Sequence, residues 1–379
     1  VILVTALALS DGRLREAADA MGTSRWRIFH TITLPGARYG VISATFVVFT
    51  LVITDFGIPK VIGGQFSVLA TDAYRQVVGQ QNFPMGAVVG IILLVPAVLA
   101  FFVDRVVQRR QSAMLSARAV PYVPKPDRHR DLALLGFVSL IALAIVGPYA
   151  VAFWGSFVKY WPYNLSLTLG NYDFSTVEPD GWGPYHNSLL LASLTALIGT
   201  ALIFTGAYLI EKVKLFPRLR GFAQFLAMLP MAVPGLVLGL GYVFFYNAGW
   251  NPLGFLYGTL AILVINTVAH FYTVGHITAL TSLKQLDSEF ESVSASLKVP
   301  FWSTFRRVTA PICLPAMILL YGADTKLASI AIVHMDEAGA MASAAGMASV
   351  IMVTAIAVKL AHVGLDQLVF GRLQQWRQR

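Results

Sequence analysis

The chain contains one stretch twice, and its first copy reads Arg15-Glu16-Ala17-Ala18-Asp19-Ala20-Met21-Gly22. This copy continues through Trp26 and Phe29 to Leu34-Pro35, and the second copy begins at Glu291-Ser292-Val293-Ser294-Ala295-Ser296-Leu297-Lys298. One constant offset places Trp26 on Trp302, Phe29 on Phe305, Thr33 on Thr309 and Pro35 on Pro311. Both copies are amphipathic and lie between long apolar runs, so the organisation of the chain has to account for the repeat.

The composition is that of a membrane protein. Of the 379 residues, 56% are hydrophobic and only 12% are charged, whereas a soluble domain carries about 25% charged residues. We therefore expect an all-α, polytopic bundle of membrane-spanning helices. The net charge of +9 comes from Lys and Arg in short loops beside apolar runs, which is the pattern of cytoplasmic loops. No basic stripe with interleaved aromatic residues indicates nucleic-acid binding.

The apolar runs and the charges between them predict a topology. The expected spans are Tyr39–Thr54, Gly86–Val103, Leu132–Phe153, Asn187–Ile210, Phe222–Phe245, Phe255–Leu280 and Met341–Val358. The segment Val158–His186 is acidic and rich in Trp and Tyr, which suits an outer loop near the aromatic belt, and Lys60–Phe83 is also placed outside. The basic residues Arg372, Arg377 and Arg379 place the C-terminus in the cytoplasm.

The chain divides into two unequal halves. The basic, proline-punctuated stretch 106–130 predicts a cytoplasmic linker between 1–105, the C-terminal part of a first half, and 131–379, a second half. Val1–Ser10 lacks the features of a signal peptide. The offset of the repeat implies that the first half lacks several spans before its motif.

A second gap is expected after Pro311. The chain has to cross the membrane between Arg307 and the acidic pair Asp336-Glu337, but only Ile312–Tyr321 is apolar. Ten helical residues span about 15 Å of a core of about 30 Å. We expect that about 20 residues, most of one helix, are absent there. Alternatively, Ile312–Val333 crosses with two charged residues inside it, which is costly.

Catalytic and metal motifs do not occur in the sequence. It contains no phosphate loop, no G-x-S-x-G elbow and no H-E-x-x-H pair. The histidines are scattered, and His270 and His276 are more simply explained as satisfied within a helix bundle than as metal ligands. We expect no catalytic residue, no cofactor and no metal site, and the chain cannot hydrolyse ATP by itself. The expected spans are also almost free of Asp and Glu, which disfavours an ion-coupled secondary transporter. Work must then enter through a cytoplasmic surface.

The motif has the properties of such a surface. Glu16–Met21 is rich in helix formers, with Glu16 placed near the helix N-terminus and Gly22 placed to end the helix in a left-handed conformation. Small alanines let a short helix sit deep in a groove of a partner. Residues 25–29 form an amphipathic segment, and Leu34-Pro35 restarts the next span.

The pattern Glu16-Ala17-Ala18, Gly22, Ile32, Leu34 and Pro35 resembles the EAA loop of binding-protein-dependent ABC transporter permeases. Two such loops in one chain resemble the fused permeases of the ferric-iron, thiamine and 2-aminoethylphosphonate group. Within that group, the 2-aminoethylphosphonate type is most similar on the segments 54–61, 79–83, 229–239 and 335–339.

The resemblance implies an inner-membrane permease of a bacterial importer. Its partners would be a cytoplasmic ABC ATPase dimer, a periplasmic solute-binding protein and the lipid bilayer. The ATPase-docking residues it implies are Glu16, Ala17, Ala18, Gly22, Leu34 and Pro35 in the first loop, and Glu291, Ser292, Lys298, Trp302 and Pro311 in the second. The substrate would be 2-aminoethylphosphonate, with ferric iron or thiamine as alternatives.

Two further expectations concern the second loop and the transport path. On the offset that matches Pro311 to Pro35, Ser292 falls at the position of Glu16 and Lys298 at that of Gly22, so the second loop would contribute less to coupling. The residues Pro230, Pro234 and Gly235 interrupt an apolar run and predict a broken or bent helix, either along the path or only for packing.

Overall fold

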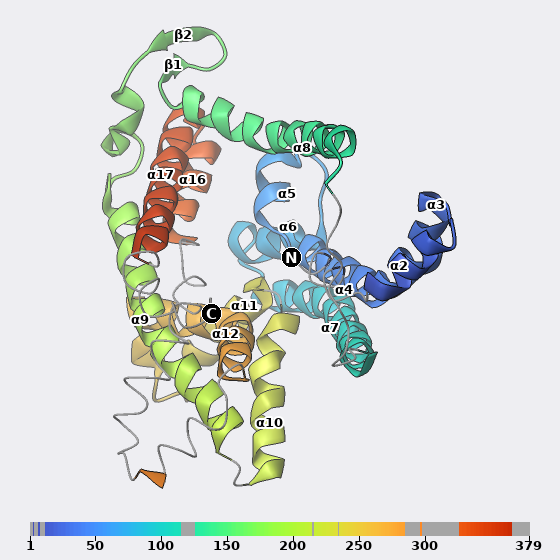
Figure 1. The fold of residues 1–379 in the computed structure, drawn as a ribbon. Helices are drawn as coiled ribbons and strands as arrows, with labels where there is room; N and C mark the ends of the chain where they lie inside the picture. Colours follow the sequence, from blue (N-terminus) through green and yellow to red (C-terminus); the bar gives the residue numbers. More distant parts are fainter. Residues whose placement is uncertain are drawn as a thin grey trace. The chain divides into compact units, whose positions relative to one another are not determined.

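The computed structural model describes residues 12–114, 126–213, 216–233, 235–284 and 326–365, together with positions 3, 7, 296 and 297. These residues are mostly helical (Figure 1). The helices are α2 Gly12–Ala20, α3 Arg25–Ile28, α4 Leu34–Ile53, α5 Gly57–Ile62, α6 Leu69–Tyr74, α7 Phe83–Met114, α8 Arg128–Gly155, α9 Gly183–Lys212, α10 Pro217–Met228, α11 Gly235–Tyr246, α12 Leu260–Lys284, α16 Lys326–Glu337 and α17 Met341–Leu365.

Shorter elements connect the helices. Two π-helical turns cover Phe29–Thr33 and Arg75–Gly79, and 3-10 turns cover Gly170–Tyr172, Phe174–Thr176, Leu229–Ala232 and Gly254–Leu256. Strands β1 Val158–Tyr160 and β2 Asn164–Leu167 form an antiparallel hairpin, in which Val158 pairs with Leu167 and Tyr160 with Asn164.

The expected membrane character is present in the described part of the chain. By length and composition, four helices there are able to cross a membrane: α8, α9, residues 260–280 of α12 and residues 341–364 of α17. A fifth span is present if the bent pair Arg25–Arg38 and Gly40–Ile53 counts as one. The apolar helix Phe83–Pro96 in α7 is shorter than a span.

Four segments differ in detail from the expected spans and loops, the first of them at the break that Pro230, Pro234 and Gly235 predict. The run Phe222–Phe245 is interrupted between α10 and α11. Helix α7 continues to Met114, past the start of the expected linker at residue 106, and Asp336-Glu337 ends helix α16 instead of forming a loop. The outer segment Lys60–Phe83 is largely helical, because it holds the end of α5, all of α6 and a π turn. Most of the expected crossing after Pro311 lies outside the described residues.

The chain folds into two compact units, and the first comprises Val1–Leu140 with Ala232–Gly241. In this unit α7 packs against α4 and α6. Gly86 of α7 has to be a glycine at this contact, because a β-carbon there would overlap the side chain of Val77. Residues 232–241 join the unit along α7, where a β-carbon added to Gly90 would lie 3.4 Å from Cγ2 of Val237.

The second unit comprises Ile141–Met231 with Tyr242–Arg379, and its centre is the packing of α9 against α12. Leu191 packs with Val264 and Val268 in one cluster, and Ile203, Phe204, Ala207, Ala279 and Leu283 form another. Both helices therefore run in the same direction. Helices α16 and α17 build a third cluster around the buried ring of Phe174. Ser188 of α9 accepts a hydrogen bond from the N–H of Ala328 at 2.6 Å, so it satisfies an open donor in the first turn of α16.

Candidate functional site

Helix α2 of the first motif copy ends at Gly22, as the sequence predicts. Gly22 is left-handed, with φ of +69°. Its N–H donates to the carbonyl of Asp19 at 3.0 Å, and the N–H of Thr23 donates to that of Ala18 at 3.1 Å. This is the Schellman arrangement, in which a left-handed residue after the helix satisfies two carbonyls of the last turn. Glycine adopts it without the steric cost that an L side chain meets.

Glu16 does not lie in the first turn of its helix, which corrects the expected position. Helix α2 begins at Gly12, so Glu16 is in the second turn, and the favourable effect of a carboxylate on the helix dipole is confined to the first. Glu16 and Ala17 are exposed, whereas Ala18 is only 3% exposed. The motif therefore presents Glu16 and Ala17 outward and packs Ala18 inward.

No loop separates α3 from the apolar helix α4. Every residue from Arg25 to Ile53 is helical, so Leu34-Pro35 does not restart a span as expected but continues one. Pro35 lacks the N–H that the carbonyl of Thr31 would accept in an α-helix. The π turn accommodates this, because the N–H of Leu34 donates to the carbonyl of Phe29, five residues back. The run bends by 58° between its two parts, Arg25–Arg38 and Gly40–Ile53.

Large apolar side chains are exposed along this part of the chain. They are Leu14 and Met21 on or beside α2, and Trp26 and Phe29 after Gly22. Trp26 is 73% exposed. Its ring stacks on Phe29 with centroids 6.1 Å apart and meets His30 edge-on at 4.3 Å. Exposed aromatic side chains next to arginines are typical of surfaces that contact another protein. We call residues 12–35 the motif loop.

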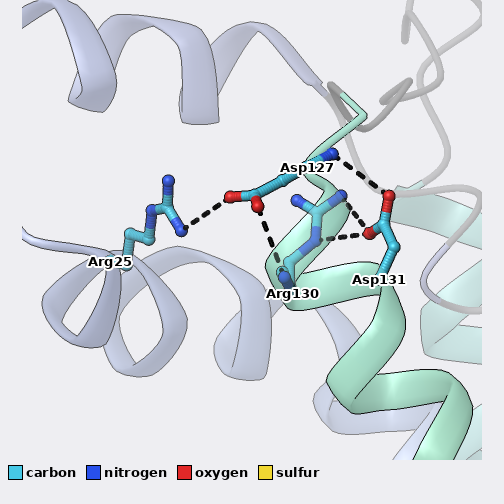
Figure 2. Close-up of polar contacts among 4 residues, drawn as sticks. All are labelled: Arg25, Asp127, Arg130 and Asp131. Atoms are coloured by element: carbon cyan, nitrogen blue, oxygen red, sulfur yellow. Dashed lines mark hydrogen bonds and ion pairs between the residues drawn. The ribbon is translucent and has the colours of Figure 1, made fainter.

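A carboxylate links the motif loop to the start of α8. Asp127 caps this helix, because its Oδ1 accepts the N–H of Arg130 at 3.3 Å, and Asp131 accepts the N–H of Asp127 at 3.1 Å (Figure 2). The other oxygen of Asp127 lies 3.8 Å from the guanidinium of Arg25. The Arg25 side chain is exposed, so this ion pair contributes at most about 1 kcal/mol. It orients the loop only weakly.

The second motif copy lies outside the described residues, apart from Ser296 and Leu297. No structural comparison with the first copy is therefore made for Glu291, Ser292, Lys298, Trp302 and Pro311. The lesser contribution of the second loop stays a prediction.

The predicted interruption by Pro230, Pro234 and Gly235 is present as a break in the helix. Helix α10 ends at Met228, Pro230 lies in a 3-10 turn, and Gly235 opens α11. Pro234 is outside the described residues. Pro230 has no N–H to donate to the carbonyl of Leu226, and this carbonyl accepts the N–H of Leu229 instead. Each helix is about 18 Å long, too short to cross a core of about 30 Å alone.

Side chains of α12 hold the end of α10 at this break. The hydroxyl of Thr273 donates to the carbonyl of Ala227 at 2.8 Å, and Nε2 of His276 lies 2.9 Å from Oε1 of Gln224. Thr273 and His276 are buried. Ala227 is in the last turn of α10, where carbonyls lack partners within the helix. This contact was not predicted from the sequence, because Thr273 is one of several threonines in an apolar helix.

Metal binding finds no geometric support in this part of the molecule. No group of three or more His, Cys, Asp or Glu residues within the described segments is placed to hold a metal ion. This observation concerns resident metal sites, because a transported metal ion needs only transient contacts.

Comparison with known proteins connects the motif loop to a transporter family. Residues 1–113 match the family model described as "Binding-protein-dependent transport system inner membrane component". This family is the membrane component of such systems and not their ATPase. The match includes the motif loop, α4 and nearly all of α7.

Two of the similar proteins are ferric-iron permeases that match most of the chain. The chain is 29% identical over 327 residues to a protein of Haemophilus influenzae named as a ferric transport system permease, FbpB 1, covering 84% of this chain and 50% of that protein. It is 28% identical over 391 residues to the ferric transport system permease FbpB of Actinobacillus pleuropneumoniae, covering 95% and 55%. A protein of Salmonella paratyphi A named as a 2-aminoethylphosphonate transport system permease, PhnV, matches 24% of this chain at 33% identity. The chain spans about half the length of the two ferric relatives.

Replacing Gly22 tests the cap of α2. In Gly22→Ala, no atom lies within 4 Å of the new β-carbon, so the cost is conformational and amounts to about 1 kcal/mol. We expect the amides of α2 to exchange with deuterium about fivefold faster. Gly221→Ala in α10 is the control, because its β-carbon also meets nothing within 4 Å but its φ is not positive. Alanine should leave exchange there unchanged or slow it, and an equal response at both sites would contradict the cap.

Replacing Thr273 tests the hold of α12 on α10. Thr273→Val keeps the shape but leaves the carbonyl of Ala227 without its donor, which should cost about 1–3 kcal/mol of stability against denaturation in detergent. Thr267→Val is the matched control, because the hydroxyl of Thr267 donates only to Leu263 of its own helix. That variant should change stability by less than about 0.5 kcal/mol. Equal losses in the two variants would show that the contact between α10 and α12 is unimportant.

Proposed function

We propose that this chain is the permease subunit of a bacterial binding-protein-dependent ABC importer and that its motif loop docks a cytoplasmic ATPase. The observation that carries the proposal is the helical run from Arg25 to Ile53, in which no loop intervenes although the run bends by 58° between Arg38 and Gly40. It joins an exposed loop, which matches an inner-membrane transport component, directly to an apolar helix. A force applied to the loop would reach the apolar helix through helical backbone, by way of the bend between Arg38 and Gly40.

The residues of the motif loop have distinct proposed roles. Glu16 and Ala17 would face the ATPase, and Ala18 would hold α2 against the permease. Gly22 would set the turn between α2 and α3, and the exposed Trp26 would supply the largest apolar contact. Leu34 and Pro35 would carry the movement into α4. The second loop, with Glu291, Ser292, Lys298, Trp302 and Pro311, would dock the other ATPase subunit.

The remaining parts of the importer are proposed partners. A separate ATPase dimer would supply the work, because the sequence has no phosphate loop. A solute-binding protein would deliver the substrate on the opposite face, toward Val158–His186. The C-terminus would lie in the cytoplasm with the motif loops, as its arginines predict. The break at Pro230, Pro234 and Gly235 is proposed to line the path.

Ferric iron is the substrate that the comparisons favour. The expected substrate, 2-aminoethylphosphonate, rests on a relative that matches only 24% of the chain, whereas the two ferric permeases match 84% and 95% of it. We therefore propose the ferric alternative. The binding protein, more than the permease, would select the solute.

The docking role is tested by Trp26→Ala in the full-length protein. Removal of a central aromatic contact should weaken binding of the cognate ATPase at least tenfold, which corresponds to about 1.4 kcal/mol. The control is Trp250→Ala, because Trp250 is 74% exposed and Trp26 is 73% exposed, yet Trp250 lies between α11 and α12. Binding measured by surface-immobilised ATPase should be unchanged in the control. If Trp26→Ala binds the ATPase as tightly as Trp250→Ala does, this loop does not have the docking role.

The substrate is tested on the solute-binding protein encoded beside the permease. Calorimetric titration should show binding of Fe³⁺ and none of 2-aminoethylphosphonate. Binding of the phosphonate alone would overturn the ferric proposal and leave the permease proposal in place. Absence of both a binding protein and a phosphate-loop ATPase from the neighbouring genes would count against the permease itself.

A further inference from the structure

The hairpin β1–β2 exposes an apolar surface directly after a membrane-spanning helix. Its exposed large side chains are Tyr160, Trp161, Tyr163, Leu165, Leu167 and Leu169. Tyr163 is 82% exposed at the tip, and its ring stacks on that of Tyr160 with centroids 5.9 Å apart. Lys159 is the single charged residue from Ser156 to Gly170. A surface of this kind on a folded protein marks contact with a membrane or with another protein.

The exposure of the hairpin is maintained by its base. Nδ2 of Asn171 donates to the carbonyls of Ser156 and Val158 at 3.0 and 2.7 Å. The hydroxyls of Ser156 and Tyr172 lie 2.8 Å apart. Next to them the ring of Phe174 is fully buried among residues of α16 and α17. The base is therefore fixed to the second unit, and the tip projects from it.

The hairpin lies at the depth where helix α8 ends. Helix α8 has 28 residues and a length of about 42 Å, which matches the roughly 40–45 Å of a bilayer with its headgroups. It ends at Gly155, and β1 begins at Val158. Trp154, in the last turn of α8, contacts Trp161 of the hairpin edge-on, with ring centroids 5.3 Å apart. The tip therefore folds back beside the end of the span.

We propose that the hairpin inserts its tip into the lipid headgroup boundary of the leaflet in which α8 ends. Tyr and Trp prefer this layer because their rings are apolar and their hydroxyl or N–H groups can remain hydrated. The near absence of charge allows the insertion. The exposed acidic residues Asp173 and Asp180 follow in the second half of the segment, so the same connection has a lipid-facing arm and a water-facing arm. This inference does not depend on the transport proposal.

The position of the hairpin favours lipid over a protein partner. Because the tip is tied to the last turn of α8, a soluble protein would have to enter the headgroup layer to cover it. A docking site for a soluble protein is better formed by the acidic arm, which carries the charges that steer association. Lipid is present at that depth in any membrane and covers the exposed rings without a further partner.

The test measures lipid and water contact at single labelled positions. Cys313 is the only cysteine, so Cys313→Ser provides a cysteine-free full chain for reconstitution in phosphatidylcholine nanodiscs. A polarity-sensitive fluorophore is attached in Tyr163→Cys, with Leu167→Cys as a second hairpin position and Asp180→Cys as the control on the acidic arm. Nanodiscs leave both faces of the bilayer accessible to iodide, and spin-labelled phosphatidylcholine quenches only groups that contact lipid.

Insertion predicts opposite responses on the two arms. Labels at positions 163 and 167 should be quenched at least threefold more strongly by the spin-labelled lipid than the label at 180, and several-fold less by iodide. If both hairpin labels respond to iodide like position 180 and not to the lipid quencher, the proposal is wrong. If the lipid quencher has no effect on the hairpin labels and a solute-binding protein shields them from iodide, a protein covers the hairpin and the lipid proposal is also overturned.

Discussion

Backbone hydrogen bonding at prolines is the constraint on which the described membrane helices depend. Hydrocarbon offers no water to an unpaired carbonyl, so a proline in a span requires another donor or a shifted bonding pattern. Two solutions are seen at Pro35 and near Pro230, whereas Pro96 and Pro148 lie inside the described helices α7 and α8. Before Pro35, a π turn shifts the pattern so that Leu34 bonds Phe29. Near Pro230, the helix stops, and Thr273 of α12 donates to the carbonyl of Ala227. The first solution preserves a continuous helix, and the second breaks one but ties it to a neighbour.

These solutions have different mechanical consequences. The run from Arg25 to Ile53 has no intervening loop and bends by 58° between Arg38 and Gly40, so a displacement of the motif loop would reach the rest of α4 through that bend. At α10 the chain turns into a 3-10 segment, and the end of α10 is held to α12 by Thr273 with Ala227 and His276 with Gln224, while Arg220 near its start donates to the carbonyl of Ile210 in α9. Few contacts make a segment easier to open locally.

The sequence predicts those features that follow from composition and single residues. Long apolar runs predicted α8, α9, α12 and α17, and a glycine after a helix predicted the left-handed turn at Gly22. It did not predict the π turn, because a proline in an apolar run is also compatible with a kink or a new helix start. Nor did it predict the role of Thr273. Thr267 and Thr278 in the same helix donate only to carbonyls within α12, and the sequence does not distinguish Thr273 from them. Which carbonyl lacks a donor is decided by tertiary contacts. The assignment of the motif loop to docking came from a family pattern and not from chemistry visible in the residues.

The second motif copy lacks the glycine that follows helix α2 in the first copy. At Gly22 the φ of +69° lets two N–H groups satisfy the carbonyls of Asp19 and Ala18. Lys298 occupies the equivalent sequence position, and a lysine in that conformation would lose about 1 kcal/mol relative to glycine. The second copy therefore has a reason either to end its helix elsewhere or to carry the strain. If the second copy ends its helix elsewhere, the two proposed docking loops would meet their partners at different angles, which is the physical reason for the predicted inequality of coupling.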